Sequence, residues 1–153
     1  MSGDNKTEIL KRQWWEALEG QGAEVTWPDE AGEAALEEML KLDGDLRYVP
    51  GLGLVCLRVS ETPPGAWSVP DALLDRLASS ESAWWLVLLV GRLSGEGAQG
   101  YILGDLSSPP VKNPPQSEGG VVSIQERRHL DSTRMILSIE KLAAILMRHR
   151  QHP

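Results

Sequence analysis

The sequence has a single cysteine, Cys56, no phenylalanine and no long apolar segment. One cysteine excludes an intramolecular disulfide and any zinc site built from several cysteines. The longest apolar run, residues 83–90, is eight residues long, whereas a helix that spans a bilayer needs about 20. The first fifteen residues are polar and charged, which is not the pattern of a signal peptide. We therefore expect a soluble cytoplasmic protein without a membrane partner, in which Cys56 is a small core residue.

Charge is spread unevenly along the chain, whose net charge is −7. The first forty residues carry ten acidic and three basic side chains, whereas residues 121–153 carry three acidic and six basic ones. This balance disfavours a uniformly basic nucleic-acid binder, although phosphate contacts need only one basic patch. We expect a protein partner for the acidic first part, and the basic C-terminal face leaves nucleic acid open as a second partner.

Apolar periodicity predicts helices and strands in alternation. Three-and-four spacing indicates helices over residues 7–21 and 31–42, a third opened by Pro70 and Asp71 and running to residue 78, and a last one capped by Ser138. Alternating or continuous apolar runs indicate strands over residues 23–27, 46–49, 52–59, 84–90, 101–106 and 121–124, the last at a sheet edge. The segments 61–68 and 107–120, rich in Pro, Gly and Ser, are expected to be loops. The prediction is one α/β domain over residues 1–153, a mixed β-sheet flanked by helices.

Arg58 is the one charged residue within the apolar strand 52–59. A buried guanidinium needs a partner, because an unpaired charge in an apolar surrounding is very costly. We expect Arg58 to pair with an acid such as Asp45 or Glu8, or to face a cleft. Both acids also have simpler explanations: Asp45 beside Gly44 is typical of a turn, and Glu8 suits the first turn of a helix.

Together these residues follow a known pattern. Glu8 lies on the first helix, Asp45 opens the hairpin, and Cys56-Leu57-Arg58 stands on the following strand. Over residues 7–106 this order resembles the restriction-endonuclease-like, or PD-(D/E)XK, nuclease superfamily. The resemblance implies a restriction-endonuclease-like fold, with Glu8, Asp45 and Arg58 as candidate catalytic residues and Asp45 as a magnesium ligand.

The chain departs from that pattern where the superfamily has an acid, a spacer and a lysine. Cys56 supplies no oxygen ligand, and its soft sulfur does not suit magnesium. Arg58 keeps a positive charge but does not exchange protons as a lysine can. The leading hypothesis is a degenerate, non-catalytic member that serves as a binding or accessory module, with no cofactor, in the defence or mobile-element context that the superfamily suggests. An active magnesium-dependent nuclease that takes its second carboxylate from Glu61, Asp71 or Asp75 is the alternative.

A third hypothesis is an α/β protein-interaction module unrelated to nucleases. The strongest binding candidates are Arg127, Arg128 and Arg134, the centre of the only basic concentration, which could contact phosphates or an acidic protein, or could form a solvated face. The three histidines are expected to be surface residues, because their spacing is not that of a metal site. No phosphate-binding glycine loop, dinucleotide fingerprint or Gly-x-Ser-x-Gly motif is present.

Overall fold

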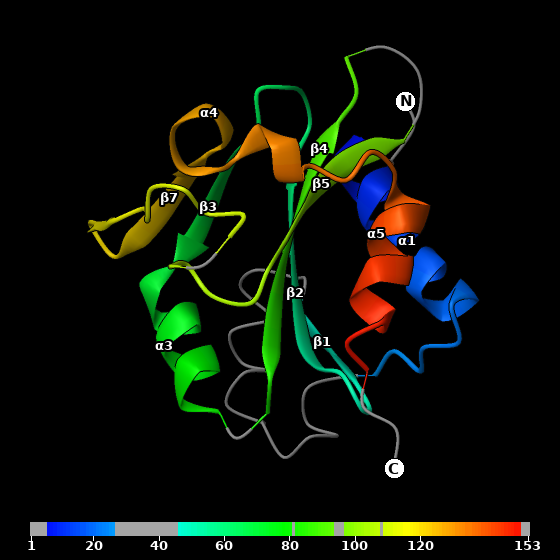
Figure 1. Ribbon diagram of the computed structural model, residues 1–153. Helices are drawn as coiled ribbons and strands as arrows, with labels where there is room; N and C mark the ends of the chain where they lie inside the picture. Colours follow the sequence, from blue (N-terminus) through cyan, green and yellow to red (C-terminus); the bar gives the residue numbers. More distant parts are fainter. Residues whose placement is uncertain (1–5, 27–45, 81, 94–96, 108, 151–153) are drawn as a thin grey trace.

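The computed structural model describes residues 6–26, 46–80, 82–93, 97–107 and 109–150. At its centre is a four-stranded mixed sheet with strand order β1-β2-β4-β5 (Figure 1). The strands are β1 (Leu46–Val49), β2 (Gly53–Ser60), β4 (Trp84–Gly91) and β5 (Ala98–Leu103). The two predicted hairpins are confirmed, since β1 and β2 pair antiparallel, as do β4 and β5. Strand β5 begins at Ala98 rather than at Tyr101.

Strands β2 and β4 pair in parallel, so the chain crosses between them outside the sheet. Helix α3 (Asp71–Ser79) lies on this connection and confirms the predicted third helix. Its apolar residues Leu73 and Leu77 are buried, four positions apart on one face. A parallel pair requires such a crossover, because a tight turn can join only antiparallel strands.

A second, three-stranded sheet corrects three predictions. It has the order β3-β7-β6, with β3 (Ala66–Pro70), β7 (Val121–Gln125) and β6 (Ser117–Glu118). Residues 61–68 were expected to be a loop, but β3 begins at Ala66, because its buried and exposed side chains alternate and its backbone pairs with β7. Residues 107–120 were expected to be a loop throughout, but Ser117 and Glu118 form β6 by pairing with β7. Strand β7 was expected at an edge, yet it lies between β3 and β6. The fold is therefore α/β with two sheets rather than one.

Helices α1 (Lys6–Gly20) and α5 (Ile139–Met147) confirm the first and last predicted helices. The hydroxyl of Ser138 accepts a hydrogen bond from the backbone N–H of Lys141, at 3.1 Å, and so caps α5 as predicted. The predicted strand 23–27 is wrong for residues 23–26, where only Thr26 forms a bridge, to Tyr48. The predicted helix 31–42 lies outside the described residues.

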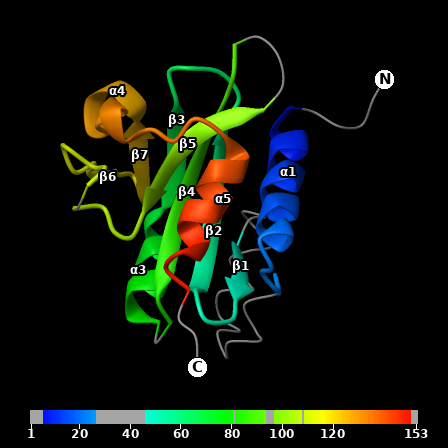
Figure 2. The same cartoon turned by 45° about the vertical axis from the view of Figure 1, so that its right-hand side comes forward.

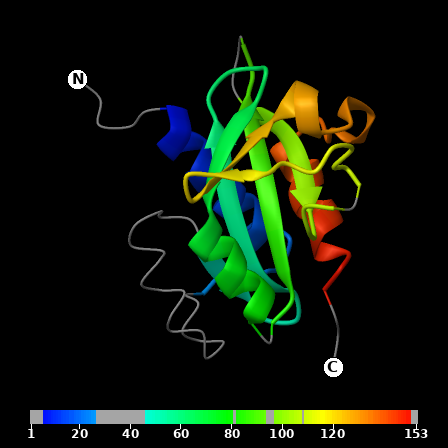
Figure 3. The same ribbon diagram turned by 90° about the vertical axis from the view of Figure 1, so that its left-hand side faces the viewer.

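Apolar side chains on the two faces of the central sheet form two separate clusters. Helices α1 and α5 lie side by side on one face (Figure 2), and α3 and the three-stranded sheet cover the other (Figure 3). Strand β4 is buried on both faces, since Leu86 to Val90 are each 0% exposed. Within the part of the chain that the structure describes, no helix has the length and apolar character needed to cross a membrane.

Candidate functional site

Two hydrogen bonds join the first turn of α1 to the residues that follow two strands of the central sheet. The Thr7 hydroxyl donates a 2.6 Å hydrogen bond to the carboxylate of Glu61, the residue after β2. The Lys6 ammonium donates a 2.7 Å hydrogen bond to the carbonyl oxygen of Arg92, the residue after β4. These bonds bring the N-terminal end of α1 next to the strand that carries Arg58.

Alternation along β2 places Cys56 and Arg58 on one face of the sheet, because side chains two residues apart in a strand point the same way. Leu57 belongs to the cluster beneath α1 and α5, whereas Cys56 belongs to the cluster beneath α3 and the three-stranded sheet. Cys56 is 2% exposed, which confirms the prediction that it is a core residue. The position that would hold a metal-binding acid is therefore enclosed by apolar side chains.

Arg58 lies two residues beyond the last β2 residue that pairs with the described part of β1. Among the described residues, β1 pairs with Gly53 to Cys56 of β2, whereas β4 follows β2 as far as Ser60. Arg58 is half-buried and lines an open pocket of about 230 Å³, here called the Arg58 pocket. Its other lining residues come from α1, β2 and the start of β3: Thr7, Lys11, Val59, Ala66, Trp67 and Ser68. Arg58 thus lines a pocket, which is one of the two arrangements expected for it, whereas the expected pairing with Asp45 falls outside the described residues.

Among the described residues that line the Arg58 pocket, the two charged ones, Lys11 and Arg58, are cationic. Lys11 also pairs with Glu8 on the same helix, at 3.7 Å, and the Glu8 side chain is 57% exposed. An exposed pair of this kind contributes little to stability and exchanges readily with solvent or another anion. The pocket therefore offers two positive charges near the end of a strand, with the carboxylate of Glu61 held close to its rim by Thr7.

The acidic residues predicted as catalytic residues or metal ligands are not gathered at one site among the described residues. Glu8 is on the first turn of α1, one turn before Lys11, and Asp45, the predicted metal ligand, lies outside the described residues. Of the three proposed replacement acids, Glu61 adjoins the Arg58 pocket through Thr7. Asp71 opens α3 beyond the far end of β3 and accepts a hydrogen bond from the Ser117 hydroxyl. Asp75 is exposed on α3.

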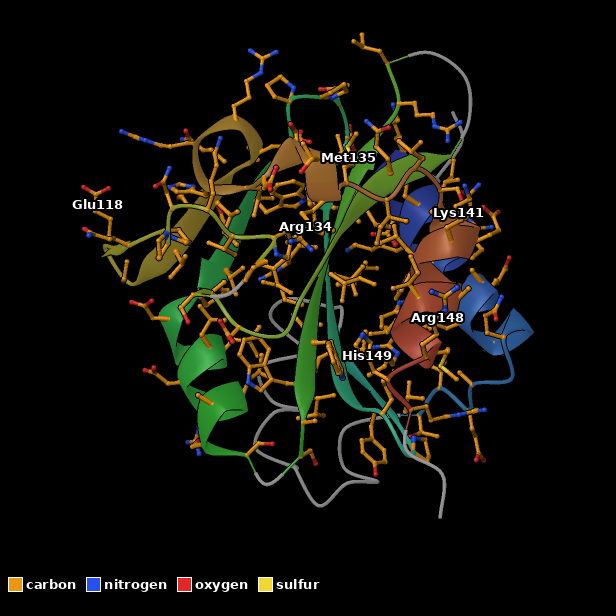
Figure 4. The ribbon with its side chains drawn as sticks, in the orientation of Figure 1. Glu118, Arg134, Met135, Lys141, Arg148 and His149 are labelled. Atoms are coloured by element: carbon orange, nitrogen blue, oxygen red, sulfur yellow. The ribbon has the colours of Figure 1, made fainter. Side chains whose placement is uncertain are left out.

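The predicted basic residues lie close together in the sequence but occupy two short elements. Arg127 and Arg128 are on helix α4 (Glu126–His129), and Arg134 ends the 3₁₀ helix η2 (Ser132–Arg134). All three are exposed. Figure 4 shows Arg134 well apart from Arg148, which follows α5. The basic C-terminal region therefore does not form one continuous face.

Two ionisable side chains beside these arginines have shifted pKa values. Burial lowers the pKa of His129, and the nearby charge of Arg128 lowers it further. The ring of His129 accepts a 2.9 Å hydrogen bond at Nδ1 from the backbone N–H of Gln125, which requires that nitrogen to be unprotonated. Hydrogen bonds from the side chain and backbone of Thr133 hold the pKa of Asp131 below its ordinary value.

The sequence did not single out Glu126, whose carboxylate joins three elements. Its Oε2 accepts a 2.5 Å hydrogen bond from the hydroxyl of Tyr101 on β5, and its Oε1 accepts a 2.8 Å bond from the backbone N–H of Gly65. Tyr101 is 0% exposed. Burial, followed by the hydrogen bond to Glu126 and its charge, raises the pKa of Tyr101. No local pattern could have found this pair, because the two residues are 25 positions apart.

Among the residues that the structure describes, no three His, Cys, Asp or Glu side chains are grouped so that they could hold a metal ion. Comparison of the chain with protein-family models, with curated proteins and with solved structures gave no match.

Proposed function

We propose that this chain is a non-catalytic binding module on a degenerate nuclease-like scaffold, and that the Arg58 pocket holds a phosphate group of a nucleic acid. The proposal depends mainly on one observation: Cys56 and Arg58 share a face of β2, with Cys56 enclosed in the core and Arg58 at a pocket. The position of the acid has become apolar while the position of the cation still reaches the surface. That combination supports phosphate binding without metal-dependent cleavage.

The chemistry of the pocket suits an anion. Arg58 has five N–H donors in a planar fork that matches the oxygens of a phosphate, and Lys11 adds a second positive charge. A volume of about 230 Å³ has room for one such group but not for a whole nucleotide chain, so the rest of the ligand would run over the surface. The partner proposed here is therefore a nucleic acid held mainly through its backbone, whose binding weakens as salt rises.

Fluorescence anisotropy with labelled single-stranded and duplex oligonucleotides at several salt concentrations tests this function. Arg58→Gln and Lys11→Gln should each weaken binding about tenfold and reduce the salt dependence by roughly one phosphate contact. Arg76→Gln, an exposed residue in the last turn of α3, is the matched control and should bind as the unaltered protein does. Circular dichroism of each variant would confirm that the fold is kept. Binding that is absent at low salt, or equally weakened by Arg76→Gln, would refute the proposal.

The alternative of an active nuclease with a displaced carboxylate is favoured by one observation, the position of Glu61 beside Thr7 at the Arg58 pocket. It predicts cleavage of the same oligonucleotides in Mg²⁺ or Mn²⁺, with activity lost in Glu61→Gln. Binding without cleavage in either metal would support the non-catalytic module instead.

A further inference from the structure

A second pocket, of about 420 Å³, lies beside α4. We call it the α4 pocket. It is bounded by the segment after β2, the end of β4, the start of β5 and the two short C-terminal helices, and its lining includes Pro63, Pro64, Leu93, Gln99, Lys112 and Glu126. Pockets that hold small molecules typically range from about 300 to 1,000 Å³. The α4 pocket is therefore large enough for a ligand of roughly mononucleotide size.

Glu126 gives this pocket a fixed hydrogen-bond acceptor. Each oxygen of its carboxylate accepts one bond, from Tyr101 and from the backbone N–H of Gly65. A carboxylate has about four acceptor positions, so about two remain for a ligand. Because Tyr101 is fully buried and its ring packs edge-on against Trp67, the acceptor is held by groups that cannot easily move. Such a fixed acceptor suits a ligand that carries N–H donors.

Two cations at the same pocket suit a ligand that is also anionic. Lys112 and Arg127 both line it, and both are exposed. The backbone N–H of Lys112 donates a 2.8 Å hydrogen bond to the carbonyl oxygen of His129, which fixes the Lys112 backbone beside α4. The α4 pocket is thus lined both by two positive charges and by the hydrogen-bond-accepting carboxylate of Glu126.

Part of the remaining lining is apolar, beside the polar Gln99 and Ser132. Pro63 and Pro64 line one part, and Leu93 lines another although its side chain is 79% exposed. An exposed leucine in a pocket lining loses water-accessible apolar surface when a flat ring covers it, and this burial favours binding. The walls therefore favour a planar, weakly polar ring between the acceptor and the cations.

We propose that the α4 pocket binds a nucleoside monophosphate unit. Its base packs against Pro64 and Leu93 and donates an amino N–H to Glu126, and its phosphate meets Lys112 and Arg127. The unit is either a free mononucleotide or the 5′-phosphorylated end of a nucleic acid, since both present the same groups. The proposal goes beyond the Arg58 pocket and does not depend on it.

Isothermal titration calorimetry tests the proposal with the whole chain and these probes: cytidine and uridine monophosphates, cytidine, inorganic phosphate and a 5′-phosphorylated oligonucleotide. We expect the monophosphates to bind, and both cytidine and phosphate alone to bind at least tenfold more weakly. In the Arg58→Gln protein, where the other proposed nucleic-acid site is weakened, saturation by the oligonucleotide but not by the monophosphates would identify a nucleic-acid end as the ligand. The reverse would identify a free nucleotide. No binding by either class, or equal binding by inorganic phosphate, would overturn the proposal.

Substitutions in the lining test whether the monophosphates bind at the α4 pocket. Lys112→Ala and Arg127→Ala should each weaken binding of the monophosphates about fivefold or more, as the loss of a charge-assisted hydrogen bond at a partly exposed site predicts. Arg128→Ala is the matched control, because Arg128 is the next residue on α4 and is exposed. Equal loss in Arg127→Ala and Arg128→Ala would contradict the assignment.

The acceptor has its own test. Cytidine monophosphate carries an amino group where uridine monophosphate carries a carbonyl, so Glu126→Gln should reduce affinity for the first more than for the second. Equal losses for the two nucleotides would exclude the proposed contact between Glu126 and the base. Arg76→Gln, which lines neither pocket, should leave monophosphate binding unchanged. The two pockets share no described lining residue, so Lys112→Ala and Arg58→Gln test them separately.

Discussion

The hydroxyl of Tyr101 donates a 2.5 Å hydrogen bond to Oε2 of Glu126 and so joins the central sheet to the helix that follows the second sheet. Tyr101 is buried in the apolar cluster between the two sheets, where its hydroxyl needs a partner. Glu126 also accepts a hydrogen bond from the backbone N–H of Gly65, just before β3. The two side chains therefore hold β5, α4 and the entry to β3 together.

Removing this hydroxyl should destabilise the protein. Tyr101→Phe deletes one charge-assisted hydrogen bond and leaves Glu126 with a weaker set of donors, so we expect the free energy of unfolding to fall by about 1.5–3 kcal/mol. Urea denaturation monitored by tryptophan fluorescence measures the change. Tyr48→Phe, a half-buried tyrosine on β1, is the control and should change stability by less. Equal effects of the two substitutions would show that the bond to Glu126 contributes nothing specific.

The same pair predicts how stability depends on alkaline pH. Burial and then the hydrogen bond and charge of Glu126 raise the pKa of Tyr101 above that of the unfolded chain, which is about 10. The stabilisation is fully present below pH 10 and is lost as the pH rises further, because the unfolded chain releases the proton first. In Tyr101→Phe the free energy of unfolding should fall less steeply with pH, by up to about 1.4 kcal/mol per pH unit. Urea denaturation between pH 9 and 11 gives both slopes, and parallel slopes would contradict the prediction.

Gly100 lies where β4 and β5 approach closely. A Cβ atom added there would overlap the backbone carbonyl of Leu88, and Gly100 also exchanges two backbone hydrogen bonds with Ile136, at 2.8 and 2.9 Å. Gly100→Ala should therefore lower the free energy of unfolding by about 1–3 kcal/mol or more, since the strands must shift apart. Gly104→Ala is the matched control: the nearest atom to its Cβ would be on Trp85 at 3.7 Å, an ordinary contact. Thermal unfolding followed by circular dichroism compares the two, and similar stabilities would contradict the expected clash.

Cys56 should be unreactive in the folded protein. It is 2% exposed among apolar side chains, so a thiol reagent such as DTNB should label it only when the protein unfolds. Labelling in native buffer compared with labelling in urea measures this directly. Fast labelling in native buffer would mean that the position is open, and would weaken the argument against a metal ligand there.

Placing an acid at position 56 tests whether that position can hold a metal-binding carboxylate. Cys56→Asp would bury a carboxylate in the core and should destabilise the fold by several kcal/mol, whereas Cys56→Ala should cost less. Urea denaturation of the two variants, with and without Mg²⁺, measures the difference. A stable Cys56→Asp protein that gains stability from the metal would show that the site still accepts a cation.

Much of the fold could be predicted from local pattern. The three-and-four spacing of apolar residues gave α1 and α5, and continuous apolar runs gave β2 and β4, because a helix stripe or a doubly covered strand leaves its period in the sequence. The burial of Cys56 also followed from its type and position on β2, whereas for Arg58 the sequence left both pairing with an acid and a place at a pocket open. Those conclusions needed no knowledge of distant residues.

Only the tertiary structure decided how the two hairpins and the remaining strands assemble into two sheets and which distant side chains meet. The local sequence of β3 predicts a loop. The segment forms a strand because it pairs with β7, more than fifty positions away. The bond between Tyr101 and Glu126, and the meeting of Lys112 with Arg127 at one pocket, depend in the same way on contacts between distant segments. Such contacts leave no periodic signal, because hydrogen-bond geometry across space places no requirement on neighbouring residues in the chain.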